Sequence, residues 1–426
     1  MAISTVHRLT SILCLIVSAV ACAKGPIIDT TSGTVRGYYP DAATRAFLGI
    51  PYAQPPLGSL RFKPPQPIKE KAKGVIDATE FGLSCYQQRT AVAGATSLTP
   101  TTGESEDCLT LNIWGSAEPS RRLKPVFVYR MNIFGFANSP ALPEKNAGIR
   151  DLRLAVEWLR DNIAAFGGDP KRMVLGGQSA GSISTSIYAF AYPNDPIVQG
   201  FIMQSGQALT MPPIPDDTAE WTNLAEKVGC RSSNSTEELT CMQEIDSFTL
   251  KRTLSPEDLN PIGVAATLPT IDNVTVFSQD TYLSLAAAGK FAKIPALRGL
   301  TDKEGNALTN FTPEGPANQT INDFLTTYWY NCPTAMEAKA NIYLAEVALV
   351  FGTINNVRQR DPEPYELQAQ DYLQEAWVAF IKNPRRGLKD FGWPSYNPNT
   401  TSLVEVFKDN SINASFADPS TYDAVC

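Results

Sequence analysis

Along the middle of the chain, short apolar runs alternate with longer segments whose apolar residues recur at helical spacing. Residues 109–114 and 126–129 are apolar runs typical of buried strands. Residues 149–165 carry one apolar helical face, formed by Ile149, Leu152, Val156, Leu159 and Ile163. A Gly-Gly-Asp-Pro stop, a short strand at 173–175 and a second helix from Ala180 follow. This alternation predicts an α/β fold with a mostly parallel central sheet.

The two ends of the chain show other patterns. Residues 26–53 alternate apolar and polar positions around turn signals, which predicts a small antiparallel sheet. Residues 51–67 are rich in proline and favour a surface connection. Residues 365–380 carry an apolar stripe and predict another helix. Because no internal repeat interrupts the pattern, residues 24–426 are interpreted as a single domain.

Composition narrows the location and the partners of the protein. The 426 residues carry a formal net charge of -7, and the one dense basic patch, at 69–73, is better explained as a solvated surface loop, so nucleic acid and anionic membranes are disfavoured as partners. Residues 1–23 combine His7-Arg8, an apolar run and small residues, which is typical of a cleaved signal peptide. No later segment is long and apolar enough to span a bilayer. We therefore expect a secreted, extracellular protein, and its oligomeric state stays open.

The cysteines and sequons agree with export. The six cysteines beyond the signal peptide have no metal-site spacing and no histidine nearby, so neither a metal nor a cofactor is expected. The short-range pairs Cys85–Cys108 and Cys230–Cys241 are the expected disulfides, whereas Cys332 and Cys426 either pair or stay free. Sequons predict N-glycosylation at Asn234, Asn273, Asn310, Asn318, Asn399 and Asn413.

A G-x-S-x-G motif at residues 177–181 lies between the predicted strand and the second helix. In that context the tight turn projects the Ser179 hydroxyl at the carboxyl edge of the sheet. The next backbone N–H, from Ala180, points toward the place where an acyl oxyanion would form. The motif alone is a weak signal, because a glycine-rich turn with an exposed serine has the same sequence.

The text around the motif resembles the type-B carboxylesterase family, the cholinesterase and fungal lipase relatives with an α/β-hydrolase fold. The resemblance covers most of the chain and rests on FLGIPYA at 47–53, EDCLTLN at 106–112, EWLRDNI at 157–163 and MQSG at 203–206. It implies a Ser–Glu–His triad acting on an uncharged or choline-type carboxylic ester, a small-molecule substrate. Ser179 would be the nucleophile. Glu304 would be the acid that orients the imidazole, with Asp302 as the fallback. Without the resemblance, Glu304 reads as a surface acid at a helix start.

The sequence departs from the family pattern at two places. Its single histidine, His7, lies in the signal peptide, and Tyr343 stands near the position where relatives carry the catalytic histidine. In relatives a His-Gly-Gly stretch, a helix and a strand follow the 126–129 strand, but here Tyr129 abuts Arg130. We infer internal deletions at 129/130 and near 340/341. One family strand is therefore missing, and we expect poorly covered surface where the sheet closes.

Three interpretations follow. In the first, the sequence is that of an esterase that has lost two internal segments, so ester hydrolysis is absent or strongly impaired as written. In the second, the chain is a non-catalytic secreted binding or adhesion module on the same fold. In the third, residual catalysis uses Tyr343 or a lysine as base, although a phenol with a pKa near 10 is a poor base at neutral pH. The identity of the ester stays open.

Overall fold

The computed structural model describes most of the chain beyond residue 24. The described residues are 25–87, 102–118, 123–210, 215–216, 218–254, 268–301, 303–308, 311–312, 315–316, 318–338, 364–408 and 411–426. The predicted signal peptide, Asp302, Asn310 and Tyr343 lie outside these ranges.

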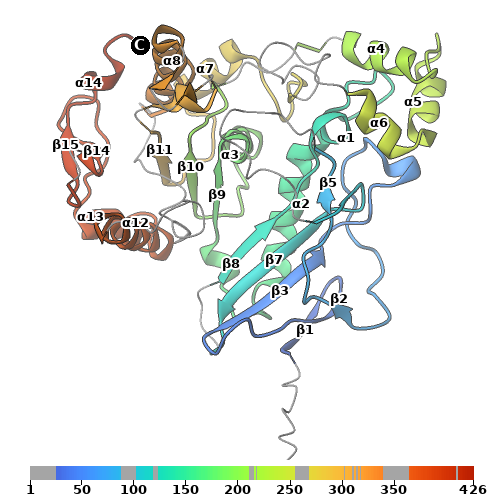
Figure 1. Cartoon of the computed structure of the whole chain (residues 1–426), viewed down its shortest axis with the longest axis horizontal. Helices are drawn as coiled ribbons and strands as arrows, with labels where there is room; N and C mark the ends of the chain where they lie inside the picture. The colour runs from blue at the N-terminus through green and yellow to red at the C-terminus, as the bar shows by residue number, and fades with distance from the viewer. Residues whose placement is uncertain are drawn as a thin grey trace, which may run out of the picture.

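Short strands and helices of moderate length make up the described part (Figure 1). The strands are β1 (Ile27–Thr30), β2 (Gly33–Arg36), β3 (Thr44–Pro51), β4 (Ile76–Asp77), β5 (Ser84–Cys85), β6 (Glu104–Ser105), β7 (Thr110–Ser116), β8 (Leu123–Phe127), β9 (Val174–Gln178), β10 (Gly200–Gln204), β11 (Ala296–Gly299), β12 (Phe311–Thr312), β13 (Gly315–Pro316), β14 (Leu403–Glu405) and β15 (Ser415–Ala417). The helices are α1 (Asn132–Phe136), α2 (Ala147–Asn162), α3 (Ala180–Ala191), α4 (Ala219–Lys227), α5 (Ser235–Glu244), α6 (Ser247–Thr253), α7 (Gln279–Ala287), α8 (Gln319–Leu325), α9 (Cys332–Ala338), α12 (Pro364–Lys382), α13 (Gly387–Phe391) and α14 (Ser420–Asp423).

The central sheet consists of two halves. In the first half, β3 pairs with β7 and β7 with β8, both antiparallel. In the second half, β9 pairs with β10 and β10 with β11, both parallel. No pairing joins β8 to β9, and both strands are fully described. The predicted α/β fold is confirmed, and the parallel ladder is confined to the second half.

The sequence predicts the elements well and their ends less well. The helix predicted at 149–165 is α2, which begins two residues earlier and ends at Asn162. The strand predicted at 126–129 is β8, which begins at Leu123 and ends at Phe127. Within residues 26–53, β1 and β2 form the expected antiparallel hairpin, but β3 leaves it and pairs with β7. Ends shift because partner strands, not local propensity, decide where a ladder stops.

Helix α2 links the two halves of the sheet. Its residue Leu159, and Ile163 just after its end, pack with the core under β3 and β7. One to two turns earlier, Leu152 and Val156 pack with Leu175 of β9 and with residues of β10. A single amphipathic helix therefore buries apolar surface from both halves, and this packing joins them where the hydrogen-bond ladder does not.

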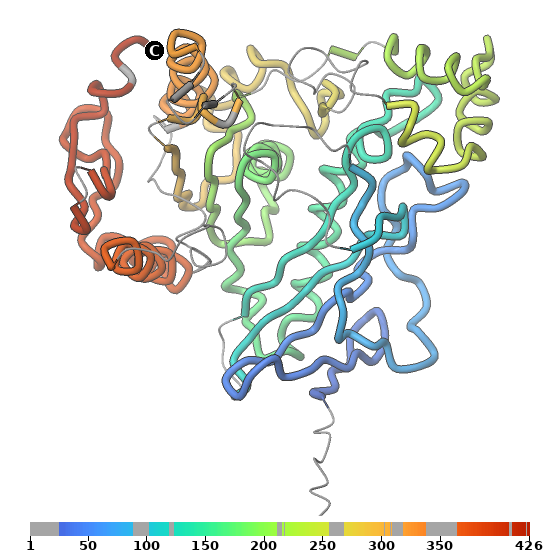
Figure 2. Tube along the Cα trace, viewed as in Figure 1, coloured from blue at the N-terminus to red at the C-terminus, as the bar shows by residue number. Residues whose placement is uncertain are grey.

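The C-terminal segment forms an arch that returns to the body of the molecule (Figure 2). Helix α12 packs Leu373, Ala376 and Trp377 against Ile202 and Leu297 of the parallel half-sheet. The chain then passes through α13, β14 and β15 and ends beside α8 and α9. Cys426, the last residue, forms a disulfide with Cys332 of α9. The alternative left open by the sequence is thereby decided in favour of pairing.

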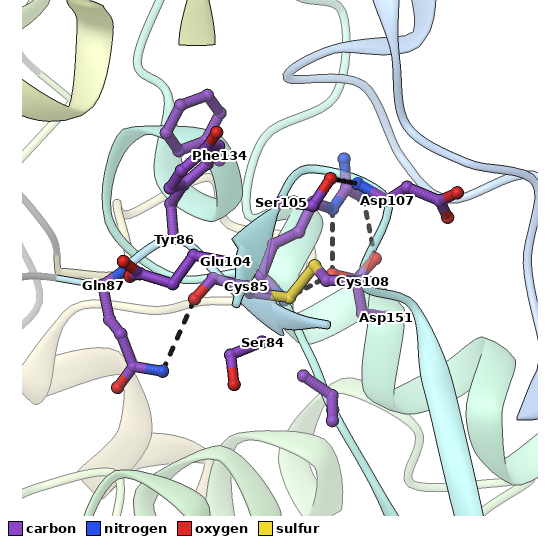
Figure 3. Close-up of a disulfide and its surroundings, with 12 residues drawn as sticks. Ser84, Cys85, Tyr86, Gln87, Glu104, Ser105, Asp107, Cys108, Phe134 and Asp151 are labelled. Atoms are coloured by element: carbon purple, nitrogen blue, oxygen red, sulfur yellow. Dashed lines mark hydrogen bonds and ion pairs between the residues drawn. A yellow bond between two sulfur atoms is a disulfide. The ribbon is translucent and has the colours of Figure 1, made fainter. Parts of the chain in front are cut away.

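The two short-range disulfides are present as expected, Cys85–Cys108 and Cys230–Cys241. Figure 3 shows the first of them beside Tyr86 and Phe134, whose rings stack with centroids 5.3 Å apart. The bond joins Cys85 of β5 to the loop before β7. Tyr86, next to Cys85, packs on Phe134 of α1, the helix that follows the Tyr129–Arg130 junction.

Candidate active site

The G-x-S-x-G segment forms a strained turn between β9 and α3. Ser179 has φ 52° and ψ -120°, a backbone conformation that L-residues rarely adopt. The turn is held on both sides, because Ser179 N–H donates to the Gln204 carbonyl at 2.8 Å and the Ser179 carbonyl accepts from Ile183 N–H at 2.9 Å. Gly177 is required, since a Cβ there would overlap the carbonyl of Gly181. This is the geometry of a nucleophile elbow.

Ser179 and Ala180 are exposed to solvent. Ala180 is the first residue of α3, so the backbone N–H groups of the first helical turn point out of that end of the helix. An acyl group attached to Ser179 would meet these donors. Gly176 and Gln178 of β9 are also exposed. This is unusual for a strand that lies between two helices, because flanking helices normally cover a parallel strand.

Glu304 lies at the same edge of the sheet as Ser179. It begins a turn of 3₁₀ helix at Glu304–Ala307, in the loop after β11, and its side chain is buried. Because β9, β10 and β11 are parallel, their carboxyl ends meet at one edge. Ser179 and the Glu304 loop therefore follow strands that are separated only by β10. Asp302, the fallback acid, lies outside the described residues.

The acid loop is tightly held. The Thr301 N–H donates to Glu304 Oε1 at 2.8 Å, and the Gly305 N–H donates to Thr326 Oγ1 at 2.9 Å. A Cβ at residue 305 would overlap Asn322 of α8, so only glycine fits there. These contacts hold the Glu304 loop and its carboxylate in one position without a contribution from a base.

Tyr330, which no sequence motif singles out, interacts electrostatically with Glu304. Burial raises the pKa of Tyr330 from 10.0 to about 12, and the negative charge of Glu304 adds to the rise. A phenol with so high a pKa does not act as a base at neutral pH.

A buried ion pair behind the elbow was also missed. Arg298 of β11 pairs with Glu337 of α9, and Ser186 Oγ of α3 donates to Glu337 Oε2 at 2.9 Å. Both charged side chains are more than nine-tenths buried. Strand β11, which leads to Glu304, and helix α3, which follows Ser179, are thus joined through one carboxylate. An arginine inside an otherwise apolar strand, 296–299, was the signal available in the sequence.

The junction at Tyr129 and Arg130 is well anchored. Tyr52 donates its hydroxyl to the Val128 carbonyl at 2.6 Å. Arg130 donates to Asp151 through its backbone N–H, Nε and one terminal nitrogen, at 2.7–2.9 Å, and both side chains are almost fully buried. The chain therefore passes from β8 to α1 without a glycine loop between them.

The described part of the chain contains no histidine that could serve as a base beside Ser179 and Glu304. The only histidine of the sequence is His7, and both it and Tyr343 lie outside the described residues. Within the described ranges there is no group of three or more histidine, cysteine or acidic side chains arranged to hold a metal ion. Over the same ranges, every helix is too short or too polar to cross a bilayer.

Comparison with known proteins gives a consistent result. The model of the Carboxylesterase family matches residues 24–129 and 126–339. The chain is 33% identical to a chlorogenic acid esterase of Aspergillus niger, over 89% of this chain and 90% of that protein. It is 29% identical to secreted lipase 5 of Gibberella zeae, over 92% of each. The solved structure of a PNB esterase superposes with a TM-score of 0.78 over 94% of this chain and 98% of that one, at 21% identity.

The alignments with the two fungal proteins are longer than the chain. They extend over 473 and 496 residues, whereas the chain has 426. Both relatives therefore carry residues for which this chain has no counterpart.

Proposed function

Because this chain belongs to the carboxylesterase family, we propose that it is a secreted serine esterase scaffold for carboxylic esters, with Ser179 as nucleophile and Glu304 as acid. The observation that carries the proposal is the strained elbow at Ser179, at the sheet edge where the Glu304 loop also begins. Secretion is supported by the disulfides, which form in oxidising compartments, and by the similarity to secreted lipase 5 of Gibberella zeae.

In the proposed reaction, Ser179 Oγ attacks the acyl carbon of the ester and the carbonyl oxygen becomes an oxyanion. The Ala180 N–H donates to that oxyanion. A base must take the proton of the serine hydroxyl and return it to the leaving alcohol. Glu304 is held in position to orient such a base and to stabilise its charged form, but this chain supplies no histidine for that step.

We further propose that the missing base and oxyanion loop belong to two deleted segments. The two ranges matched by the family model share residues 126–129 and so meet at the Tyr129–Arg130 junction, and the second ends at 339. Both points agree with deletions at 129/130 and near 340/341. Loss of an oxyanion donor costs about 10² to 10³ in rate, and loss of a triad member leaves about 10³ to 10⁴ over water. Ester turnover is then far below that of a complete relative.

Insertion of the two segments tests this proposal. The corresponding segments of the Aspergillus relative are placed between Tyr129 and Arg130 and before Leu344, and hydrolysis of a short-chain p-nitrophenyl ester and of chlorogenic acid is measured. We expect kcat/KM to rise by about 10³-fold or more, and Ser179→Ala in the same background to abolish the gain. A folded insertion variant without a gain contradicts the esterase assignment. Equally fast, Ser179-dependent hydrolysis by the chain as written contradicts the proposed impairment.

A second candidate is a non-catalytic binding module, favoured by the absence of histidine beyond His7. Labelling with a fluorophosphonate distinguishes the two, because it requires a serine that is activated as a nucleophile. Labelling of the chain as written that is lost in Ser179→Ala excludes the binding module. A chain that stays unlabelled, and whose insertion variant also stays unlabelled, supports it.

A further inference from the structure

The C-terminal arch carries an open groove of about 480 Å³, lined by residues of α13, β15 and the segments beside them. Figure 1 shows α13 and β15 well apart from β9 and α3, the elements that flank Ser179. Trp393 and Phe416 form its apolar surface, and Lys389, Ser395 and Thr401 contribute polar groups at the groove. Trp393 is buried and donates its Nε1–H to the Tyr372 hydroxyl at 2.9 Å, so this part of the groove is rigid. Phe416 is different, because 42% of its surface is exposed.

Phe416 lies on a hairpin that has little support of its own. It occupies the middle of β15 opposite Val404 of β14, and each strand has three residues. Val404 is buried in the arch core, whereas Phe416 is among the exposed large apolar side chains. Two-stranded ribbons of this length are marginally stable in water, so a cover over Phe416 would stabilise this one.

A sequon adjoins the groove. Asn399, Thr400 and Thr401 form an Asn-x-Thr acceptor, and Thr401 is itself a groove residue. The sequon belongs to a tight turn in which Asn399 N–H donates to Asn397 Oδ1 at 3.0 Å and Ser402 Oγ donates to the Asn397 carbonyl at 2.8 Å. Asn399 is exposed. Asn399 therefore lies two residues from a groove residue, within a turn held by these hydrogen bonds.

We propose that Asn399 carries an N-linked glycan whose first sugars lie in this groove, with an apolar C–H face against the Phe416 ring. The modification joins Asn399 Nδ2 to C1 of a sugar delivered by a polyprenyl-pyrophosphate donor. The C1–O bond breaks, the pyrophosphate leaves, and the amide gives up one proton. Because the glycan is tethered beside the groove, the entropic cost of placing it there is small. Its hydroxyls meet the polar groups of the groove and solvent.

The other described sequons lack this combination. Asn234, Asn273, Asn318 and Asn413 are exposed as well, which is compatible with modification. Asn234 and Asn318 use their Oδ1 atoms to cap α5 and α8, and their sequons contribute no residue to the groove. Asn413 lies in the connection between β14 and β15, just before the strand that carries Phe416, and is not a groove residue, so it provides a matched control.

The experiment uses the full chain secreted from a yeast host. Mass spectrometry with and without glycosidase treatment reports occupancy at Asn399, and hydrogen exchange reports opening of β14 and β15. We expect Asn399→Gln to remove one glycan and to speed amide exchange in the hairpin about 5-fold. Thr401→Ser keeps the acceptor and leaves exchange unchanged. Asn413→Gln removes a glycan without changing exchange in β14.

Two further variants separate the glycan from the side chain to which it is attached. Phe416→Ala retains the glycan but should speed exchange as much as Asn399→Gln does, and the double variant should add nothing, because both changes break one contact. In unglycosylated protein from a bacterial host, Asn399→Gln should have no effect. An unoccupied Asn399 in the secreted chain, or fully additive effects of the two substitutions, overturns the proposal.

Discussion

Strands β9 and β10 are neighbours in one parallel ladder, yet they differ in how well they are covered. Every residue of β10 is buried, as is every residue of β11, whereas β9 exposes Gly176 and Gln178. Strand β8, on the other side of the interruption, exposes Lys124 and Val126. The side of the sheet formed by β10 and β11, the covered side, is therefore fully buried. The side next to the Tyr129–Arg130 junction, the junction side, consists of β8 and β9, two strands with exposed residues at edges that no described strand pairs with.

The difference has an identifiable cause. Helix α12 covers one face of β10 and β11, and the Cys332–Cys426 disulfide ties the end of the arch to α9. On the junction side α2 packs against one face of both halves, but among the described residues no strand pairs between β8 and β9. Ser179 directly follows β9, the strand that borders this interruption. A fold can thus keep its elbow geometry through local constraints while the sheet beside it is incomplete.

The largest contrast is expected between two apolar side chains. Phe201→Ala in β10 leaves a cavity in the parallel half and should lower the free energy of unfolding by about 3–5 kcal/mol. Val126→Ala in β8 removes a side chain that is 47% exposed and should cost well under about 1 kcal/mol. Urea denaturation measures both. If the two losses are similar, the junction side is covered in solution and the comparison fails.

Removal of the arch disulfide should have the next largest effect. Cys332→Ala/Cys426→Ala opens a loop of sequence separation 94, and loss of about 2–4 kcal/mol is expected from the unfolded-state entropy. Cys230→Ala/Cys241→Ala opens one of separation 11 and should cost less. Urea denaturation of both variants under non-reducing conditions provides the measurement. A larger loss from the shorter loop would mean that the arch adds little to the covered side.

Some of these features can be predicted from the sequence and others cannot. The elbow follows from Gly177 and Gly181, and α2 from its apolar period, because both depend on residues close in the chain. The poorly covered surface expected at the junction is found at Val126 and Gly176. The pairing of Cys332 with Cys426 stayed open because no local spacing brings such distant residues together. The Arg298–Glu337 pair and the coupling of Tyr330 to Glu304 depend on tertiary packing, which periodicity does not encode.

The next contrast is between the two glycines of the elbow, which lie beside the interruption between β8 and β9. Gly177→Ala places a Cβ against the Gly181 carbonyl, so the turn must shift, at a cost of about 1–3 kcal/mol, and fluorophosphonate labelling should fall with it. Gly181→Ala places a Cβ in open space within α3 and should be neutral or stabilising by about 0.5–1 kcal/mol. Thermal unfolding together with the labelling rate tests both. Equal losses of stability and labelling in the two variants would show that steric overlap of the new Cβ does not explain the effect of Gly177→Ala.

The smallest effect concerns the acid and appears only at high pH. The pKa of Tyr330 is raised to about 12, chiefly by burial and secondarily by the Glu304 carboxylate, so the folded state favours the neutral phenol. The stability that this contributes is complete below pH 10, the ordinary pKa, and is lost as the pH rises through about 12. Tyr330→Phe should remove this alkaline loss and leave stability at neutral pH unchanged apart from the hydroxyl itself. Glu304→Gln should lower the Tyr330 pKa slightly, since burial remains, and ultraviolet difference titration against Tyr330→Phe isolates that phenol. An unchanged Tyr330 pKa in Glu304→Gln would mean that no charged carboxylate faces Tyr330. The assignment of Glu304 as the catalytic acid would then be contradicted.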